Sequence, residues 1–511
     1  MSEEYISVSE MRRLEYNSEY LGVSRLQLME NAGRGVAEEV SKRAERGSSV
    51  AVLCGTGGNG GDGMVAARFL ASWGFDVSVY LVGREEAIRS EETRRNWVAV
   101  KLMDSSLKVR VLKDSSNVAE VAEADVYVDA MLGIGAKSVL RPPILQAVRR
   151  LNELEGLKLA VDVPTGIDAD TGEVLGEAFR ADVTVTFHKP KTGMKEASEY
   201  VGELVVKDIG IPPEAEAYVG PGDVIVARKP RRPTSHKGEF GRLLIVGGSE
   251  TYTGAPALVA LAALRCGVDL VYVAAPERTA YTIASMSPNL ITVKLEGAHL
   301  TPRGVATLEP YLRKATAVVL GPGLGLHRDT FEAVKELVDL FNEHKVPVVM
   351  DADGLKAFAE FKSHVELPLV LTPHAGEYRM LTGHSPEGSL QEVGEDVREE
   401  ADKLGATILL KGHVDIISDG RRVRYNRTGN PGMTIGGTGD TLSGIVGALM
   451  AHGFAPFTSA CAGAFINGAA GDLAVEELGY HIVPTDIIDR IPKVMDNPME
   501  HKRIIERRAT R

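Results

Sequence analysis

Short apolar runs recur along this chain, and each is followed by glycine and then by a stretch with helical character. Residues 49–54 (SVAVLC) lead into several glycines and then into a helical segment at 64–73. Residues 77–82, 126–132 and 157–163 continue the pattern. Strands that alternate with helices form parallel sheets covered on both faces. The repetition therefore predicts an α/β fold with helices on both sides of a parallel sheet.

The alternation is interrupted once, by a segment rich in proline, glycine and charge that ends near Thr234. A single hydrophobic core rarely grows beyond about 300 residues, and this chain has 511. We therefore predict two domains at 1–220 and 236–495, a linker at 221–235 and a tail at 496–511. The tail ends in the basic sequence HKRIIERRATR, which we expect to be solvated or frayed.

The chain is acidic, because 58 lysines and arginines face 70 aspartates and glutamates, for a net charge of −12. Such a chain repels nucleic acid and anionic membranes at long range, so we expect neither as a partner. An anionic ligand must then be held locally, by backbone amides and a few well-placed cations.

The cysteines and the apolar segments narrow the class of protein further. Cys54, Cys266 and Cys461 lie far apart and leave no material for a disulfide framework or a structural zinc site. The N-terminal residues contain no apolar signal-peptide core. The most apolar stretch, 441–465, is interrupted at Pro456 and predicts two packed helices rather than a membrane span. We expect a cytoplasmic protein.

Four segments at expected strand ends carry the chemical signal, and the first is CGTGGNGGDG at 54–63. The five glycines that follow Thr56 let backbone amides approach a ligand. The segment matches neither the GxGxxG dinucleotide fingerprint nor the GxxxxGK[ST] phosphate loop. Asn59 and Asp62 add oxygens that a tight turn does not need for its shape. We favour a ligand-binding loop, and a merely tight turn is the alternative.

The second and third segments are DAMLGIGAKSVLRPP at 129–143 and VDVPTGIDADTGE at 161–173. Open α/β sheets bind ligands beyond the carboxyl ends of their strands, so the first three segments can converge on one pocket. Asp162 ends a buried strand, where a carboxylate is costly unless it is paired or used. Taken alone, the second segment is equally well explained as a surface loop with two cations, Lys137 and Arg141.

The fourth segment, GNPGMTIGGTGDTLSG at 429–444, is the most specific. GGTGD opens an apolar helix, so the amides of Gly437, Thr438 and Gly439 form an anion cradle at the positive end of that helix. Asp440 would repel a phosphate that it merely contacted, but as a base it can accept a proton from a hydroxyl that attacks a phosphoryl group. An ordinary carboxylate at a helix N-terminus is the alternative.

Other groups in the second half fit phosphoryl transfer, although each alone is explained equally well by a structural role. Lys411 ends one expected strand and His374 follows another. Asp351 and Asp353 are candidates to hold Mg²⁺ through water. A further turn that allows close approach is GPGLG at 321–325.

These motifs make the chain similar to two known families. The N-terminal half resembles the YjeF N-terminal family of NAD(P)H-hydrate epimerases, through MENAGRGVAE, GTGGNGGDG, VDAMLGIG and VDVPTGID. The C-terminal half resembles the ADP-dependent NAD(P)H-hydrate dehydratases, a branch of the ribokinase-like fold, through HKGEFGRLLIVGGSETYTGAPALVALAALRCG, GPGLG, DADGLKAF, LTPHAGE and GGTGDTLSGIVGA. The resemblance implies a Rossmann-like three-layer domain followed by a ribokinase-like three-layer domain, fused as in two-domain NAD(P)H-hydrate repair proteins.

The resemblance also implies two activities on NADH or NADPH that has added water across its ring. The first half would interconvert the R and S hydrates, and the second would dehydrate the S hydrate with ADP and release AMP and phosphate. Phosphorylation replaces hydroxide, a poor leaving group, by phosphate, and elimination then restores the conjugated ring. The implied co-substrate and ions are ADP, Mg²⁺ and K⁺, and the choice of ADP over ATP rests on the fusion alone.

In the dehydratase half, the resemblance assigns roles to the matching positions. Asp440 would be the base, and Ala255, Gly323 and His374 would join it in contacting the hydrate. The nucleotide would be bound by Lys411, Gly412, His413, Val414, Asp415, Gly437, Thr438 and Gly439.

In the epimerase half, the resemblance makes Asp162 the acid/base group, with Lys137 as its helper. Asn59, Asp129 and Thr165 align with a potassium site, for which oxygen ligands are suited. The dinucleotide hydrate would be bound by Gly58, Asn59, Gly60, Gly61, Asp62, Gly133, Ile134, Gly135, Ala136, Lys137, Ser138, Val139 and Asp162.

The chain departs from the family patterns at Thr56, Gly58, Thr165 and Asn467. None of these differences involves Asp440, so they bear on specificity rather than on activity. One alternative is a ribokinase-like kinase for a vitamin precursor, fused to a non-catalytic YjeF-type binding domain. Another is a scaffold protein whose YjeF-like half has lost catalysis. Related domains often self-associate, so we expect a homo-oligomer.

Overall fold

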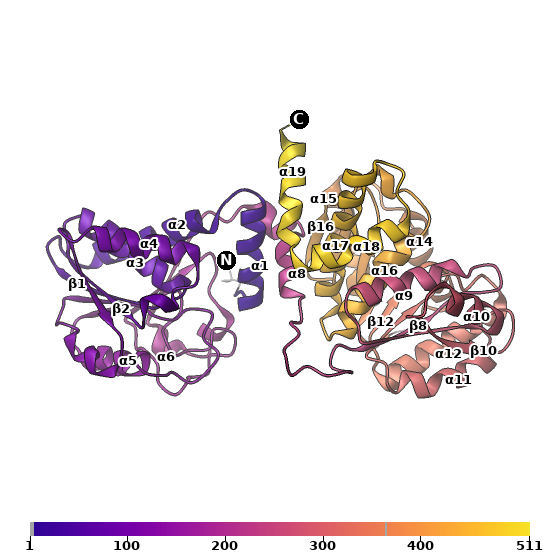
Figure 1. The fold of residues 1–511 in the computed structure, drawn as a ribbon, viewed down its shortest axis with the longest axis horizontal. Helices are drawn as coiled ribbons and strands as arrows, with labels where there is room; N and C mark the ends of the chain where they lie inside the picture. The colour runs from indigo at the N-terminus through magenta and orange to yellow at the C-terminus, as the bar shows by residue number, and fades with distance from the viewer. Residues whose placement is uncertain (1–4, 363–364, 511) are drawn as a thin grey trace. The chain divides into compact units, whose positions relative to one another are not determined.

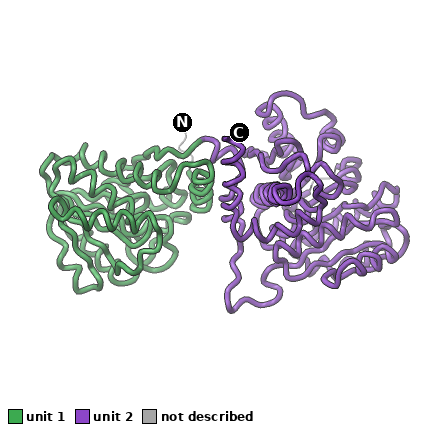
Figure 2. The backbone as a smooth tube through the Cα atoms, turned by 45° about the horizontal axis from the view of Figure 1, so that its top comes forward, with its two compact units in different colours: residues 1–212 green, residues 213–511 purple. Residues whose placement is uncertain are grey.

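The computed structural model describes residues 5–362 and 365–510. The chain forms two compact units, unit 1 at Met1–Pro212 and unit 2 at Pro213–Arg511 (Figure 2). Each unit contains one sheet that is parallel over most or all of its strands. This confirms the α/β fold that the alternating apolar runs predict.

The sheet of unit 1 has seven strands, all parallel, in the order β3-β2-β1-β4-β5-β6-β7. The strand order reverses between β1 and β4, which places a crevice at the carboxyl ends of these two strands. The strand bounds are β1 Ser49–Cys54, β2 Asp76–Val82, β3 Leu107–Leu112, β4 Val126–Ala130, β5 Leu157–Val161, β6 Val183–Phe187 and β7 Glu203–Lys207.

Helices cover both faces of this sheet (Figure 1). α2, α3 and α4 lie on one face, and α5 lies on the other. α5 buries Ala147, Val148 and Leu151 in a core shared with Leu53 and Tyr80 of the sheet. The helix bounds are α1 Val8–Tyr20, α2 Arg25–Arg43, α3 Gly58–Ser72, α4 Glu91–Leu102, α5 Ile144–Glu153 and α6 Ser198–Val201, with short 3₁₀ turns at Glu85–Ala87, Ser115–Glu120 and Thr192–Met194.

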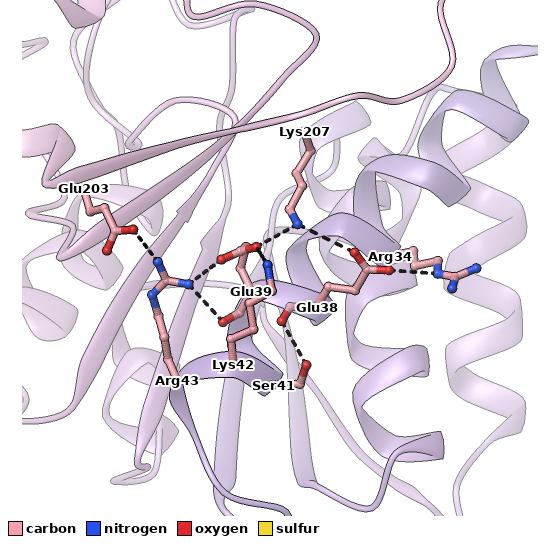
Figure 3. A network of polar contacts seen from close by, with 8 residues as sticks. All are labelled: Arg34, Glu38, Glu39, Ser41, Lys42, Arg43, Glu203 and Lys207. Atoms are coloured by element: carbon pink, nitrogen blue, oxygen red, sulfur yellow. Dashed lines mark hydrogen bonds and ion pairs between the residues drawn. The ribbon is translucent and has the colours of Figure 1, made fainter.

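Glu39 on α2 is the centre of an ion network that ties this helix to the edge strand β7 (Figure 3). Its side chain is only 3% exposed. Oε1 accepts from Nζ of Lys42 at 2.6 Å and from Nζ of Lys207 at 2.7 Å. Arg43 donates to both Glu39 and Glu203. Although burial raises the pKa of Glu39, hydrogen bonds from its cationic neighbours lower that pKa to about 2.

We expect Glu39→Gln to reduce the free energy of unfolding of unit 1 by about 1–3 kcal/mol at pH 7, because the variant leaves buried donors without their charged acceptor. The folded-state pKa of about 2 lies below the ordinary 4.5, so this contribution is full above pH 4.5 and is lost as the pH falls toward 2. Urea titrations followed by tryptophan fluorescence measure it, since Trp73 and Trp97 are the only tryptophans and both lie in unit 1.

Glu38→Gln is the matched control for this prediction. The Glu38 side chain is 40% exposed, pairs with Arg34 at 3.1 Å and lies 3.6 Å from Nζ of Lys207. Ion pairs at such an exposed site contribute little. Equal losses of stability in the two variants, or a loss in Glu39→Gln that persists undiminished at pH 2, would contradict the role assigned to Glu39.

The sheet of unit 2 has nine strands in the order β10-β9-β8-β11-β12-β13-β14-β15-β16. β8 to β14 run parallel, and β15 and β16 complete the edge as antiparallel strands. The order reverses between β8 and β11. The strand bounds are β8 Arg242–Val246, β9 Leu270–Pro276, β10 Ile291–Leu295, β11 Ala317–Leu320, β12 Val348–Met350, β13 Leu369–Leu371, β14 Thr407–Leu410, β15 Asp415–Ser418 and β16 Val423–Asn426.

The helices of unit 2 form a layer on each face of the sheet (Figure 1). α9, α16, α17 and α18 pack against one another in one layer. α11, α12 and α13 contribute Val305, Leu337 and Phe358 to the core of the other. The longer helices are α9 Gly254–Arg265, α10 Glu277–Met286, α11 Pro302–Leu312, α12 Arg328–His344, α13 Ala352–Phe361, α14 Ala375–Thr382, α15 Leu390–Leu404, α16 Thr438–Ala451, α17 Pro456–Leu478, α18 Pro484–Asp496 and α19 Lys502–Ala509, and the short ones are α7 Pro213–Ala217, α8 Pro221–Val226 and the 3₁₀ turns at Pro431–Met433 and Pro498–His501.

The apolar stretch 441–465 forms parts of two helices, as predicted, because α16 ends at Ala451 and α17 begins at Pro456. No helix among residues 5–362 and 365–510 combines the length and the apolar character that crossing a bilayer requires.

The structure corrects two of the predicted boundaries. The predicted linker 221–235 begins with α8, whose buried Asp223 pairs with Arg424 of β16 at 2.9 Å, so this part belongs to unit 2. The predicted tail 496–511 is not frayed over its described residues, because it forms a 3₁₀ turn and then α19. Proline and charge made both segments look irregular, whereas buried ion pairs hold them in place.

Candidate active sites

Unit 1 places its glycine-rich loop at the crevice between β1 and β4. The loop runs directly into α3, whose first residue is Gly58. Gly57 and Gly58 face open space, whereas a Cβ added at Gly55 or Gly60 would lie 1.9 Å from a carbonyl oxygen. The inner glycines therefore allow tight loop packing, and the outer ones leave the N-terminus of α3 open to a ligand.

Three predicted potassium ligands come together beside this loop. The buried Asp129 accepts hydrogen bonds from the backbone N–H of Thr165 at 2.8 Å and from its Oγ1 at 2.7 Å. The same hydroxyl accepts from the N–H of Leu132 at 2.9 Å. The next residue, Gly133, lies against Asn59, since a Cβ added there would be 3.2 Å from Asn59 Oδ1.

These residues fit a monovalent cation. Both polar atoms of the Asn59 side chain are buried and have no hydrogen-bond partner among the described residues. Such atoms are costly unless something satisfies them. Burial raises the pKa of the Asp129 carboxyl to about 6, and a cation would stabilise its charged form. An amide oxygen, a carboxylate and a hydroxyl form the oxygen-only donor set that K⁺ requires.

Asp162 follows β5 and adopts a left-handed backbone conformation, with φ at 63°. Its Oδ1 accepts from Nζ of Lys191 and from Oγ1 of Thr186, the latter at 3.1 Å. The Lys191 side chain has no exposed surface and also donates to the carbonyl oxygen of Phe187 at 3.0 Å. A strained backbone that aims a carboxylate at a buried ammonium is typical of a functional site.

Lys137 does not contact Asp162, which corrects the predicted pairing. Its Nζ lies 3.2 Å from Asp168 Oδ2 and 2.9 Å from Asp170 Oδ2, at the rim of the third segment. Lys191 occupies the predicted position of the helper instead. Sequence reasoning missed Lys191, although its place in HKPKTG directly after a strand was a usable signal.

The charge of Asp162 also helps to raise the pKa of two other carboxyl groups. Burial, with the charge of Asp162, raises the pKa of Glu15 on α1 to about 7. The same two causes raise the pKa of Asp62 on α3 well above its ordinary value. Glu15 can therefore hold a proton near neutral pH. Glu15 lies outside every segment that the sequence singled out.

In unit 2, the loops after β8 and β11 meet where the strand order reverses. Gly323 has a φ of 69°. A Cβ added there would lie 2.8 Å from the Cβ of Tyr252 and 3.5 Å from that of Ala255. The structure thus brings Gly323 and Ala255 together at the start of α9, and it adds Tyr252, which sequence reasoning missed.

Asp440 lies in the first turn of α16, and Lys411 faces the same helix end. A Cβ added at Gly439 would lie 3.5 Å from Nζ of Lys411. This ammonium donates to Oδ1 of Asp351 at 2.9 Å. Burial and the charge of Asp351 raise the pKa of Asp440 to about 7. Although burial lowers the pKa of Lys411, the carboxylates around it raise that pKa above its ordinary value. The site thus pairs a carboxyl group that titrates near neutrality with a firmly charged cation.

His374 caps α14 with its ring. Nδ1 accepts from the N–H of Gly376 at 2.9 Å and from that of Glu377 at 3.3 Å. Because Nδ1 accepts, the proton of the neutral ring is assigned to Nε2. The ring is 59% exposed and lines the cavity of unit 2, so it offers a donor to a ligand there.

The cavity of unit 2 has a volume of about 960 Å³ and extends from the first turn of α16. Most of the predicted nucleotide-binding residues line it, namely Lys411, Gly412, His413, Val414, Asp415, Thr438 and Gly439. Gly437 is not among the lining residues, because a Cβ added there would meet Leu258 and Pro484 at 2.7 Å. The volume suits a ligand of nucleotide size.

The two carboxylates predicted to hold Mg²⁺ have different surroundings. Asp353 accepts from Nζ of Lys356 at 2.8 Å and from the N–H of Gly325 at 2.9 Å, so it stabilises the 321–325 loop. Asp351 instead lies close enough to Asp440 to raise its pKa. A carboxylate oxygen beside a phosphate cradle suits a divalent cation held through water, so Asp351 is the better placed of the two for Mg²⁺.

Asp472 on α17 connects the C-terminal segment to the wall of the unit 2 cavity through hydrogen bonds. Its side chain is fully buried and accepts from the N–H of Gly429 at 3.1 Å and from Nδ2 of Asn430 at 2.9 Å. Oδ2 also lies 2.8 Å from Nε2 of His501, and Oδ1 lies 2.6 Å from Arg508. Gly429, Asn430 and Arg508 all line the cavity. The basic tail therefore completes the nucleotide cavity.

Arg508→Ala should raise the KM for the nucleotide about fivefold, because it removes a hydrogen bond worth about 1 kcal/mol from the wall. The kcat of dehydration and the rate of epimerisation should stay unchanged. Steady-state kinetics with varied nucleotide measure this. Arg507→Ala is the matched control, since Arg507 pairs with Glu476 on the surface and does not line the cavity. A KM that moves equally in both variants would show that Arg508 acts only through helix stability.

The two sites define the class of protein. Unit 1 is a Rossmann-like α/β domain with a cluster of carboxyl groups around Asp162, and unit 2 is a second α/β domain in which Asp440 adjoins Gly439 at the wall of a cavity of about 960 Å³. Residues 25–193 match the family model described as YjeF-related protein N-terminus, and residues 243–493 match the model described as NAD(P)H-hydrate dehydratase.

Relatives match along nearly the whole chain. The bifunctional NAD(P)H-hydrate repair enzyme of Hyperthermus butylicus is 48% identical, over 95% of this chain and 91% of its own. Those of Pyrobaculum aerophilum and Methanothermobacter thermautotrophicus are 48% and 44% identical, over 96% and 95% of this chain and 98% and 94% of their own. The chain therefore belongs to the family of bifunctional NAD(P)H-hydrate repair enzymes.

Proposed function

We propose that the chain repairs hydrated NADH and NADPH, by interconverting the R and S hydrates in unit 1 and dehydrating the S hydrate with ADP in unit 2. The observation that carries the proposal is Asp440. It combines a pKa of about 7 with a place beside Lys411 at the first turn of α16, which borders a nucleotide-sized cavity.

In the dehydration, Asp440 accepts the proton of the C6 hydroxyl while the hydroxyl oxygen attacks the β-phosphorus of ADP. The new O–P bond forms as the bond to the bridging oxygen breaks, and AMP leaves. Phosphate then leaves C6, a proton is lost from the neighbouring ring carbon, and the ring double bond is restored. Lys411 and the amides of the GGTGD turn stabilise the charge that develops on the phosphoryl group.

Other residues of unit 2 bind and orient the two substrates. Gly323 leaves room for the hydrate beside Ala255. Nε2 of His374 donates a hydrogen bond to the hydrate. Lys411 to Asp415 line the ADP site together with Thr438 and Gly439. Mg²⁺, held through water by Asp351, would supply further neutralisation of the phosphates.

In the epimerisation, Asp162 moves the proton and Lys191 orients Asp162. Glu15, whose pKa is about 7, serves as a partner for that transfer, and Asp62, whose pKa burial raises, lies in the same cluster. Asn59, Asp129 and Thr165 would bind K⁺, which supplies a fixed positive charge beside the loop that receives the dinucleotide.

The test of the proposal is incubation of the full chain with ADP, Mg²⁺ and heat-treated NADH. We expect the absorbance near the NADH band to return and AMP to appear in equal amount. Recovery that includes the R hydrate requires unit 1, because unit 2 acts on the S form. If no absorbance returns while a vitamin precursor such as hydroxyethylthiazole is phosphorylated, the chain is a small-molecule kinase instead. Replacement of ADP by ATP in the same assay tests the donor.

Two expectations from the sequence stay predictions. These are a location in the cytoplasm and assembly into a homo-oligomer. Light scattering on the purified chain measures the second, and a mass equal to one chain would contradict it.

A further inference from the structure

Two histidines and an aspartate cluster at the carboxyl edge of the unit 2 sheet. His299 follows β10, His327 follows β11, and Asp329 lies in the first turn of α12. Each offers one ligand atom, and the three atoms all lie within 4.8 Å of one another. Nε2 of His299 lies 3.7 Å and Nδ1 of His327 lies 3.9 Å from Oδ2 of Asp329.

The distances are close to those that a metal ion imposes. A tetrahedral ion with bonds of about 2.0–2.1 Å separates its ligand atoms by about 3.3 Å. The two separations from Oδ2 of Asp329 need to close by about half an ångström, and the two histidine nitrogens lie within 4.8 Å of each other. Two imidazoles and one carboxylate form a ligand set that binds divalent transition metals such as Zn²⁺, with a further position open to water.

The state of the two rings is a second observation that points to a ligand. Nε2 of His299 is buried and has no hydrogen-bond partner among the described residues. The rings of His299 and His327 are stacked, with centroids 3.8 Å apart and planes inclined by 28°. The stacking holds the two rings side by side next to the carboxylate of Asp329.

The backbone around the cluster is fixed before any ion arrives. Oγ1 of Thr330 on α12 donates to the carbonyl oxygen of Leu300 at 3.0 Å. On the other side, the N–H of Glu250 donates to the carbonyl oxygen of Ala298 at 3.0 Å. The loop that carries His299 is thus held on both sides, and little ordering is needed for binding.

Metal binding at this cluster would replace one existing hydrogen bond. Nδ1 of His327 accepts from the N–H of Asp329 at 3.2 Å and so caps α12. An ion bound to Nδ1 would replace this contact, which is long for a hydrogen bond of its kind. Losing this hydrogen bond therefore costs little stability. The carboxylate of Asp329 stays at the helix N-terminus, where negative charge is favourable.

We propose that His299, His327 and Asp329 form a binding site for one divalent transition-metal ion, outside the two catalytic sites. The site adjoins the hydrate side of unit 2, because His327 follows the 321–325 turn that carries Gly323 by two residues. A bound ion would therefore fix that turn. The inference rests on these side chains and does not depend on the proposed reaction.

The test is binding of Zn²⁺ and Co²⁺ to the full chain in excess Mg²⁺, which occupies the carboxylate sites that prefer hard cations. We expect one equivalent of Zn²⁺ by calorimetry and a visible Co²⁺ absorption spectrum typical of a four-coordinate site. His327→Asn and Asp329→Asn should each weaken binding by a factor of at least about 10, since even partners outside the first coordination shell contribute that much.

His384→Asn is the matched control. His384 clusters with Asp396 and Glu400 but already bonds Asp396 at 2.7 Å, so its loss should leave Zn²⁺ binding unchanged. His327→Asn keeps an acceptor that caps a helix well, so the variant should fold, and its melting temperature without metal checks this. The proposal is overturned if no Zn²⁺ binds, or if binding is unaffected by His327→Asn and Asp329→Asn.

Discussion

Asp440→Asn should abolish the ADP-dependent return of NADH absorbance, with a loss in kcat of about 10² to 10⁴, the usual contribution of a general base. Asparagine has nearly the same shape but cannot accept the hydroxyl proton. The pKa of about 7 also predicts the pH dependence. The base must be ionised, so the wild-type rate should rise with pH through about 7 and level off above it.

The epimerase unit provides an internal check on this variant. Asp440→Asn should leave interconversion of the R and S hydrates unchanged, as measured by chromatography of the two forms. Asp489→Asn is the matched control within unit 2, because Asp489 is exposed and pairs with Arg265 at 3.0 Å on the surface. Dehydration at the wild-type rate in Asp440→Asn would disprove the proposed role of Asp440.

Lys191→Met should abolish epimerisation while dehydration of the S hydrate continues. The substitution removes the buried ammonium that contacts Asp162 and keeps a side chain of similar length, so the carboxylate loses its cation in an enclosed site. We expect a loss in rate of about 10² or more. The measurement is consumption of the R hydrate by the variant in the presence of ADP, with the S hydrate as the reference.

A comparison with Lys137→Met separates the sequence assignment from the structural one. Nζ of Lys137 lies 2.9 Å from Oδ2 of Asp170, whereas Nζ of Lys191 donates to Oδ1 of Asp162. If Lys137→Met rather than Lys191→Met stops epimerisation, the structural assignment is wrong. Lys108→Met serves as the folding control, because Lys108 pairs with Asp76 on the surface at 2.7 Å.

Much of the site architecture was predictable because parallel strands end at one edge of their sheet. Asp129, Asp162 and the 54–63 loop each follow an apolar run, so their convergence required only the fold class. In unit 2, Lys411 was recognisable for the same reason, whereas Asp440 was recognisable from the GGTGD turn that opens its helix. The glycine pattern predicted where the binding loop lies but not what each glycine does, since Gly55 and Gly60 allow tight packing of the loop.

The residues that the sequence missed share a different property. Lys191 is buried and donates to Asp162, and Glu15 is buried near the charge of Asp162. Neither burial nor such long-range proximity can be read from spacing. The tail was misjudged for a related reason. Its arginines and His501 look solvated in sequence, and only the fold shows Asp472 buried beneath them.

The docking of α19 against Asp472 has a consequence for synthesis of the chain. Domains generally fold as units in the order in which they leave the ribosome, so unit 1 can be complete long before translation ends. The residues that close the cavity of unit 2 leave the ribosome after the whole of unit 1. A nascent chain would thus carry a finished unit 1 while the cavity of unit 2 is still open, and truncation before α19 would impair unit 2 while sparing unit 1.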